Sequence, residues 1–234
     1  MPSLASIRAS NAAFTHLTSP VPVGVFVGGT AGVGEGMARA FARHTNGNSS
    51  IVIVGRNRGA AERILASLPA PTDQSLAGNP NSVVREFVQC DATSMKNAEV
   101  ATKHILAKYP KINYLVVSTG VLSLTGRDET PEGIDKKLAV HYYTRWKFIR
   151  DLLPSLEKAK EDAEEGAVMS VMAASSGGKI DMDDLGLKKT YSLANAALAA
   201  PTYNDLMMEV SPYTTKTLRQ HSFSLLICTN AGIC

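Results

Sequence analysis

Cysteine is scarce in this sequence, and no charge of one sign dominates it. Among 234 residues there are 3 cysteines, 1 tryptophan and a formal net charge of +3. Cys90, Cys228 and Cys234 have neither the spacing of a metal site nor the even number of a disulfide framework. A reducing compartment is the simplest inference from such cysteine usage, so we expect a cytoplasmic protein without a bound metal.

The sequence also lacks the features of proteins that bind nucleic acids or membranes. Its basic residues are scattered rather than gathered in one stretch, so we expect no nucleic-acid partner. No apolar run is long enough to cross a bilayer, and residues 1–14 lack the apolar core of a signal peptide. With 44% apolar and 19% charged residues, the composition is that of an ordinary soluble protein.

Short apolar runs alternate with helix-like stretches along the chain. We expect strands at 21–28, 49–55, 82–90, 112–120, 167–174 and 223–229, and helices at 33–44, 58–68, 95–109, 131–160 and 191–210. Pro154 and Pro201 are expected to bend or divide the last two helices. Strands that are apolar on both faces are typical of a parallel sheet covered on both sides. The pattern predicts a doubly wound, Rossmann-like α/β fold with three αβα layers in a single domain.

Five glycines fall within residues 28–36, between the first expected strand and the first expected helix. Gly28, Gly32 and Gly34 are spaced G-x-x-x-G-x-G, which is neither a P-loop nor the G-x-G-x-x-G form. Glycines permit a tight turn and let a phosphate approach the backbone, where the helix N-terminus offers unpaired N–H groups. A plain glycine-rich turn is the alternative interpretation. The residues predicted to hold a dinucleotide are Gly28, Thr30, Ala31, Gly32, Val33 and Gly34. We accordingly expect residues 1–20 to be an N-terminal extension and residues 21–234 to form an NAD(P)-binding domain.

The end of the second strand indicates which dinucleotide is bound. Sites specific for NAD usually place an acidic residue there for the ribose hydroxyls. In this sequence Gly55 occupies that place, and Arg56 and Asn57 follow it. A guanidinium group suits the 2′-phosphate of NADP, so we predict NADP(H) as the cofactor. A solvated loop arginine is the alternative.

With these residues placed, the chain resembles the short-chain dehydrogenase/reductase family from about Val21 onward. GGTAGVG (28–34) is similar to the family's cofactor loop, and Asp91-Ala92 to the pair that contacts adenine. VSTG (117–120) stands where the family usually has Asn-Asn-Ala-Gly and keeps Gly120. RASNAA (8–13) and YYTR (142–145) are similar to stretches of fungal proteins of this kind, which implies a setting in secondary metabolism.

The resemblance implies a catalytic set of asparagine, serine, tyrosine and lysine, which this chain matches only in part. Tyr191 stands at the position of the acid/base tyrosine, and Asn195 replaces the lysine without supplying its positive charge. The serine position falls near Ala173, so Ser175 is the candidate substitute. His141 stands at the asparagine position and can act as an acid or base near neutral pH. A helix histidine satisfied by a backbone carbonyl is the alternative for His141.

The resemblance implies an NADP(H)-dependent oxidoreductase that acts on a small carbonyl or alcohol substrate as a homo-oligomer, most simply a dimer. One alternative is a non-redox isomerase, cyclase or dehydratase in which His141 and Tyr191 move protons. Another is a non-catalytic NADP-binding protein. LLICTNAGIC (225–234) is similar to the family's sixth strand and turn, with Ala231 in place of proline. Family members continue beyond this point, so we expect either a shortened form or a second chain that completes the site.

Overall fold

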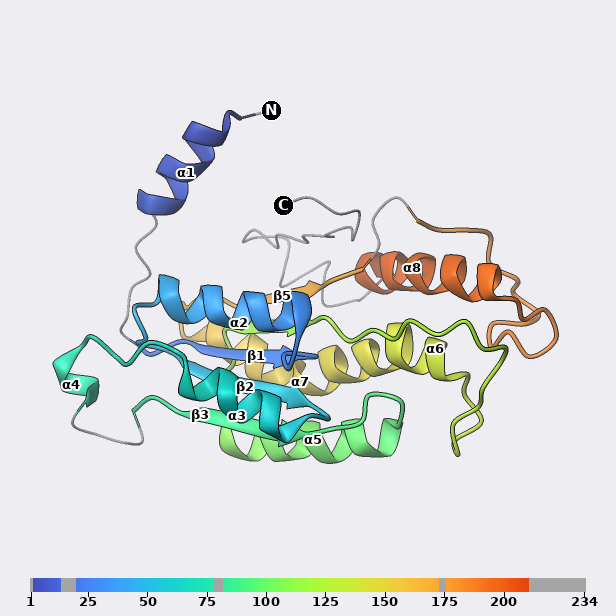
Figure 1. Ribbon diagram of the computed structural model, residues 1–234, viewed down its shortest axis with the longest axis horizontal. Coiled ribbons are helices and arrows are strands. Elements are labelled where there is room, and N and C mark those ends of the chain that lie inside the picture. Colours follow the sequence, from blue (N-terminus) through green and yellow to red (C-terminus); the bar gives the residue numbers. More distant parts are fainter. Residues whose placement is uncertain (1, 14–19, 78–81, 173–175, 211–234) are drawn as a thin grey trace.

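Figure 1 shows a computed structural model of the chain, in which one sheet lies between two layers of helices. The structure describes residues 2–13, 20–77, 82–172 and 176–210. Five parallel strands have the order β3-β2-β1-β4-β5. They are β1 (Val23–Val27), β2 (Ser50–Gly55), β3 (Arg85–Gln89), β4 (Tyr114–Val117) and β5 (Ala167–Ser170). The predicted doubly wound fold is confirmed, and the strand expected at 223–229 lies outside the described residues.

Helices lie on both faces of the sheet, and further helices lie away from it (Figure 1). They are α1 (Leu4–Ala13), α2 (Gly32–His44), α3 (Arg58–Ala66), α4 (Gln74–Ala77), α5 (Met95–Lys108), α6 (Lys136–Leu138), α7 (Thr144–Glu161) and α8 (Leu193–Val210), with a π-helical turn, η1 (Ala139–Tyr143), between α6 and α7. Helices α5 and α7 lie side by side (Figure 1). Within the described residues, no helix combines the length and the apolar character that crossing a bilayer requires.

Alternate residues of the central strands enter two separate cores. Val25 and Val52 pack with Phe148 and other residues of the α5 and α7 layer. Phe26 and Ile53 point the other way, into the layer formed by α2 and α3. Successive side chains of a strand point to opposite faces, so a strand buried on both sides needs apolar residues at every position. This burial explains the continuous apolar runs in the sequence.

The helical region expected over 131–160 begins later than predicted, and its proline does not divide it. Asp135 ends the preceding loop and caps α6, where its Oδ1 accepts from the backbone N of Lys137 at 3.0 Å and of Leu138 at 3.2 Å. The helix therefore begins at Lys136. Pro154 does not divide α7, which continues to Glu161, and Pro201 likewise lies inside α8.

Candidate active site

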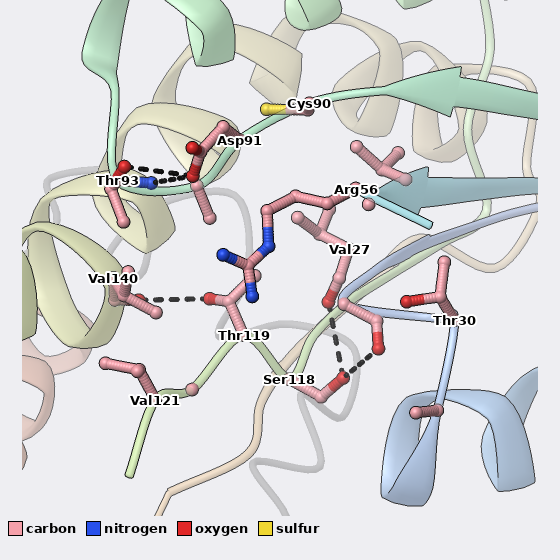
Figure 2. Close-up of a pocket in the computed structure, with 16 residues that line it drawn as sticks. Val27, Thr30, Arg56, Cys90, Asp91, Thr93, Ser118, Thr119, Val121 and Val140 are labelled. Atoms are coloured by element: carbon pink, nitrogen blue, oxygen red, sulfur yellow. Dashed lines mark hydrogen bonds between the residues drawn. The ribbon is translucent and has the colours of Figure 1, made fainter. Parts of the chain in front are cut away.

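A cavity of about 290 Å³ opens at the carboxyl ends of β1, β2, β3 and β4 (Figure 2). It lies where the strand order changes direction between β1 and β4, the place where doubly wound folds bind their ligands. Seven residues predicted to bind the cofactor line this cavity. They are Gly28, Thr30, Ala31, Arg56, Asp91, Ala92 and Gly120.

Two glycines let the loop after β1 pack against the loop after β4. Gly28 has φ +86°, its N–H donates to the carbonyl of Val54 at 2.8 Å, and a Cβ on it would lie 2.9 Å from the backbone N of Thr119. A Cβ on Gly34 would press against the hydroxyl of Ser118 and lie 2.5 Å from the carbonyl oxygen of Gly28. Any larger residue at either position would push the α2 N-terminus away from the sheet. Gly32, Val33 and Gly34 do not line the cavity, although Gly34 brings α2 close to the loop after β4.

The N-terminus of α2 is built to receive an anion. Its N-cap is Ala31, which has no side-chain acceptor for the N–H groups of the first turn and which faces the cavity. Two other helices that follow strands on this side are capped by side chains, α3 by Asn57 and α5 by Ser94. Free N–H groups and the helix dipole together favour a phosphate at such an end. The glycine cradle and this uncapped helix therefore fit the diphosphate of a dinucleotide.

Arg56 enters the cavity from the end of β2, as Figure 2 shows. Within the described part of the chain, Arg56 takes part in none of the ion pairs. Its neighbour Arg58 is engaged elsewhere, with its guanidinium 5.0 Å from the centre of the Phe87 ring and 3.7 Å from Glu62. Asn57, a predicted cofactor residue, does not line the cavity, because its Oδ1 accepts from the backbone N of Ala60 at 3.0 Å. Of Arg56, Asn57 and Arg58, only Arg56 lines the cavity, and it places a positive charge there.

The segment after β3 forms a second wall of the cavity. The carboxylate of Asp91 accepts from the backbone N of Thr93 at 3.0 Å and from its hydroxyl at 2.9 Å, which fixes the turn (Figure 2). Cys90 lies beside it, buried and free. Burial, together with the charge of Asp91, raises the pKa of the Cys90 thiol to about 12, so this cysteine stays protonated and unreactive.

Several residues of the cavity were missed by the sequence analysis. They are Thr93, Ser118, Thr119, Val121 and Val140, together with the apolar ends of the strands. Ser118 and Thr119 belong to the VSTG stretch (117–120) and follow β4 directly. Their position at the carboxyl end of a strand is the signal that could have identified them as cavity residues. The hydroxyl of Thr119 donates to the carbonyl of Val140 at 3.0 Å, which joins the loop after β4 to η1.

His141 lies behind the cavity wall and does not line it. Its Nε2 is 3.1 Å from the carbonyl oxygen and 3.3 Å from the backbone N of Val121, and its ring packs beside Gly120. Burial is the main cause that lowers the pKa of His141, and the nearby cations Arg145 and Lys137 add to it. These contacts match the alternative interpretation, in which a backbone group satisfies the histidine.

The other predicted catalytic residues are not gathered at the cavity. Tyr191 is half-buried, and its hydroxyl accepts a hydrogen bond from Lys137 Nζ at 2.9 Å. Asn195 is exposed, and its Nδ2 donates to the carbonyl of Thr190 at 2.7 Å. Ser175 lies outside the described residues. Neither Tyr191 nor its partner Lys137 lines the cavity.

The turn that leads into Tyr191 is held by one carboxylate. Asp184 accepts from the backbone N of Lys188 at 2.7 Å, of Lys189 at 2.8 Å and of Thr190 at 2.8 Å. Although desolvation opposes it, this set of hydrogen bonds lowers the pKa of Asp184 to about 2. The carboxylate stays ionised across the physiological range and keeps the turn before α8 in one shape.

Arg145 is a buried cation that joins the ends of β4 and β5. Its side chain is 1% exposed and donates to the carbonyls of Val117, Thr119 and Val171 and to the hydroxyl of Ser170. Burial lowers the pKa of Arg145 to about 10, which still leaves it charged at neutral pH. The YYTR stretch ends on this residue, whose task is to hold the loop after β4 against the sheet.

A doubly wound sheet with a phosphate-accepting glycine loop at its switch point defines the class of dinucleotide-binding α/β proteins. Within that class, the family model for short chain dehydrogenase matches residues 23–212. The chain belongs to the short-chain dehydrogenase/reductase family of oxidoreductases, which confirms the resemblance noted in its sequence.

Two fungal proteins are among its relatives. Oxidoreductase AN1596 of Emericella nidulans is 36% identical over 209 residues, and Oxidoreductase andH of Emericella variicolor is 34% identical over 209 residues. Each alignment covers 89% of this chain and 58% of the relative, so the chain spans less than two thirds of their length. Among solved structures, the fold is shared by an alcohol dehydrogenase from the archaeon Thermococcus sibiricus, complexed with 5-hydroxy-NADP. The two chains superpose with a TM-score of 0.56 and are 16% identical, and the match covers 81% of this chain and 69% of that chain.

Proposed function

We propose that this protein is an NADP(H)-dependent oxidoreductase acting on a small carbonyl or alcohol substrate. The observation that carries the proposal is the side chain of Arg56, which enters the cavity and takes part in no ion pair within the described part of the chain. A guanidinium beside the adenosine end of a dinucleotide site selects a 2′-phosphate over a free hydroxyl.

Each part of the cavity then has a separate task. Gly28 and Gly34 bring α2 close to the sheet, and the uncapped first turn at Ala31 receives the diphosphate. The segment at Asp91 and Ala92 receives the adenine. NADP(H) held there would supply or accept a hydride, and Tyr191 would exchange the proton with the substrate oxygen. In this proposal either Ser175 or His141 assists Tyr191.

The non-redox alternative needs His141 as a proton carrier. The contacts that His141 makes in the structure weaken this alternative. Nε2 of this histidine is already engaged with the backbone of Val121. The homo-oligomeric assembly, the cytoplasmic location and the role in secondary metabolism stay predictions of the sequence.

A calorimetric titration of the purified chain with NADPH and with NADH tests the proposal. We expect NADPH to bind at least about tenfold more tightly, because a hydrogen bond to a charged group contributes about 1.5–3 kcal/mol. Arg56→Ala should remove most of this preference and leave NADH binding nearly unchanged. Arg58→Ala is the matched control, since Arg58 packs on Phe87, and should keep the preference. Equal affinities in the unmodified chain, or equal losses in both variants, would contradict the NADP assignment.

A further inference from the structure

The hydroxyl of Tyr191 has a cationic partner, although position 195 holds no lysine. Nζ of Lys137 donates to the Tyr191 hydroxyl at 2.9 Å and lies 5.6 Å from the centre of its ring. Lys137 comes from α6, far from Tyr191 in sequence. We propose that Lys137 is the positioning residue for Tyr191 and stabilises its phenolate during proton transfer, a task that rests on the proposed role of Tyr191.

The charge of Lys137 is directed at the phenol rather than neutralised elsewhere. Its other hydrogen bonds go to the neutral carbonyls of Thr125 at 2.9 Å and Gly126 at 3.4 Å, and within the described residues it takes part in no ion pair. The adjacent Lys136 behaves differently, because its Nζ pairs with Asp128 at 2.8 Å. A cation that donates to a phenol oxygen favours the ionised form of that phenol, and a charge-assisted bond is about twice as strong as a neutral one.

Both partners are held in place by carboxylates that act on their backbones. Asp135 caps α6 at the backbone N of Lys137 itself, and Asp184 holds the turn that ends at Tyr191. Lys137 also lies one helical turn before His141, whose ring contacts Val121 in the cavity wall. Lys137 is therefore fixed on the helical run that contacts the cavity wall, and Tyr191 is fixed by the turn before α8, which favours a role in the reaction over a chance surface contact.

The reactivity of Tyr191 toward tetranitromethane, which attacks phenolates, measures the effect of Lys137 without any turnover. Nitration of Tyr191 in the full chain at mildly alkaline pH would be followed by peptide mass spectrometry. Lys137→Met keeps the length of the side chain and removes its charge. We expect nitration of Tyr191 to slow about tenfold in Lys137→Met, in proportion to a lost charge-assisted bond. Lys137→Arg should recover most of the rate, and Lys136→Met should match the unmodified chain.

Kinetics with NADPH and benzaldehyde as the probe carbonyl separate the two proposals. In Lys137→Met, kcat should fall about tenfold or more while KM for NADPH and the melting temperature stay nearly unchanged. If Lys137 only anchors the loop at Thr125, Tyr191 nitration will be unchanged, and that result overturns the inference. Tyr191→Phe tests the proposed function by itself: full activity there removes Tyr191 from the reaction. Loss of activity in Tyr191→Phe with full activity in Lys137→Met overturns the role of Lys137 alone.

Discussion

At the residue scale, the titration of His141 links a local contact to the stability of the whole chain. Its pKa is lowered in the folded state from the ordinary value of 6.5, chiefly by burial. As the pH falls through that value, the unfolded chain takes up the proton first, so the free energy of unfolding decreases. The stabilising contribution of neutral His141 is therefore present above the unfolded pKa and is lost on acidification.

His141→Gln should flatten this dependence, because glutamine can keep a hydrogen bond to Val121 and does not titrate. We expect the melting temperature to fall more steeply in the unmodified chain than in His141→Gln between about pH 7.5 and about pH 5.5. Differential scanning calorimetry at both pH values measures it. His44→Gln is the control, since His44 is exposed at the end of α2, and should follow the unmodified chain. Parallel curves for His141→Gln and the unmodified chain would contradict the prediction.

At the element scale, two glycines of α2 lie two residues apart in different surroundings. A Cβ on Gly34 would meet the carbonyl oxygen of Gly28 at 2.5 Å, whereas a Cβ on Gly36 would have no atom within 4 Å. Gly34→Ala should lower the free energy of unfolding by about 1–3 kcal/mol, as overpacking does, and weaken NADPH binding about tenfold. Gly36→Ala should instead raise stability by about 0.5–1 kcal/mol, since alanine favours the helix. Urea unfolding and NADPH calorimetry measure both effects, and similar behaviour of the two variants would show that α2 is not held by Gly34.

The sequence predicted those helices, strands and loops that depend on residues close together in the chain. Apolar runs and helical periodicity located the strands and helices, and the glycine spacing located the loop at Gly28, because each depends on neighbouring residues. Whether Pro154 divides its helix is decided by tertiary packing: Leu152 and Leu156 on either side are buried in the core, and this packing offsets the lost hydrogen bond. The contact of Lys137 with Tyr191 joins residues 54 positions apart. No local pattern encodes such a contact, so it needed the fold.

At the scale of the whole molecule, the cavity and the Tyr191 region depend on different parts of the chain. The cavity is built by segments that follow β1 to β4, all anchored in the two large cores. Tyr191 packs instead against a third core that contains Leu138, Leu187 and Tyr203. Substitutions in the cavity should therefore change cofactor binding, and substitutions near Tyr191 should leave it unchanged. The rise in melting temperature that the cofactor causes measures this difference.

A ligand that binds only the folded chain stabilises it in proportion to its affinity, by about 2.7 kcal/mol at a concentration of 100 times Kd. For a chain of this size we expect NADPH at that concentration to raise the melting temperature by about 5–10 °C. NADH at the same concentration should give about half that shift or less, because an affinity at least tenfold weaker removes about 1.3 kcal/mol or more. Arg56→Ala should reduce the NADPH shift to the NADH level, whereas Tyr191→Phe and Lys137→Met should keep it. If Lys137→Met lost the shift as fully as Arg56→Ala, Lys137 would belong to the cofactor site, and its partnership with Tyr191 would be secondary.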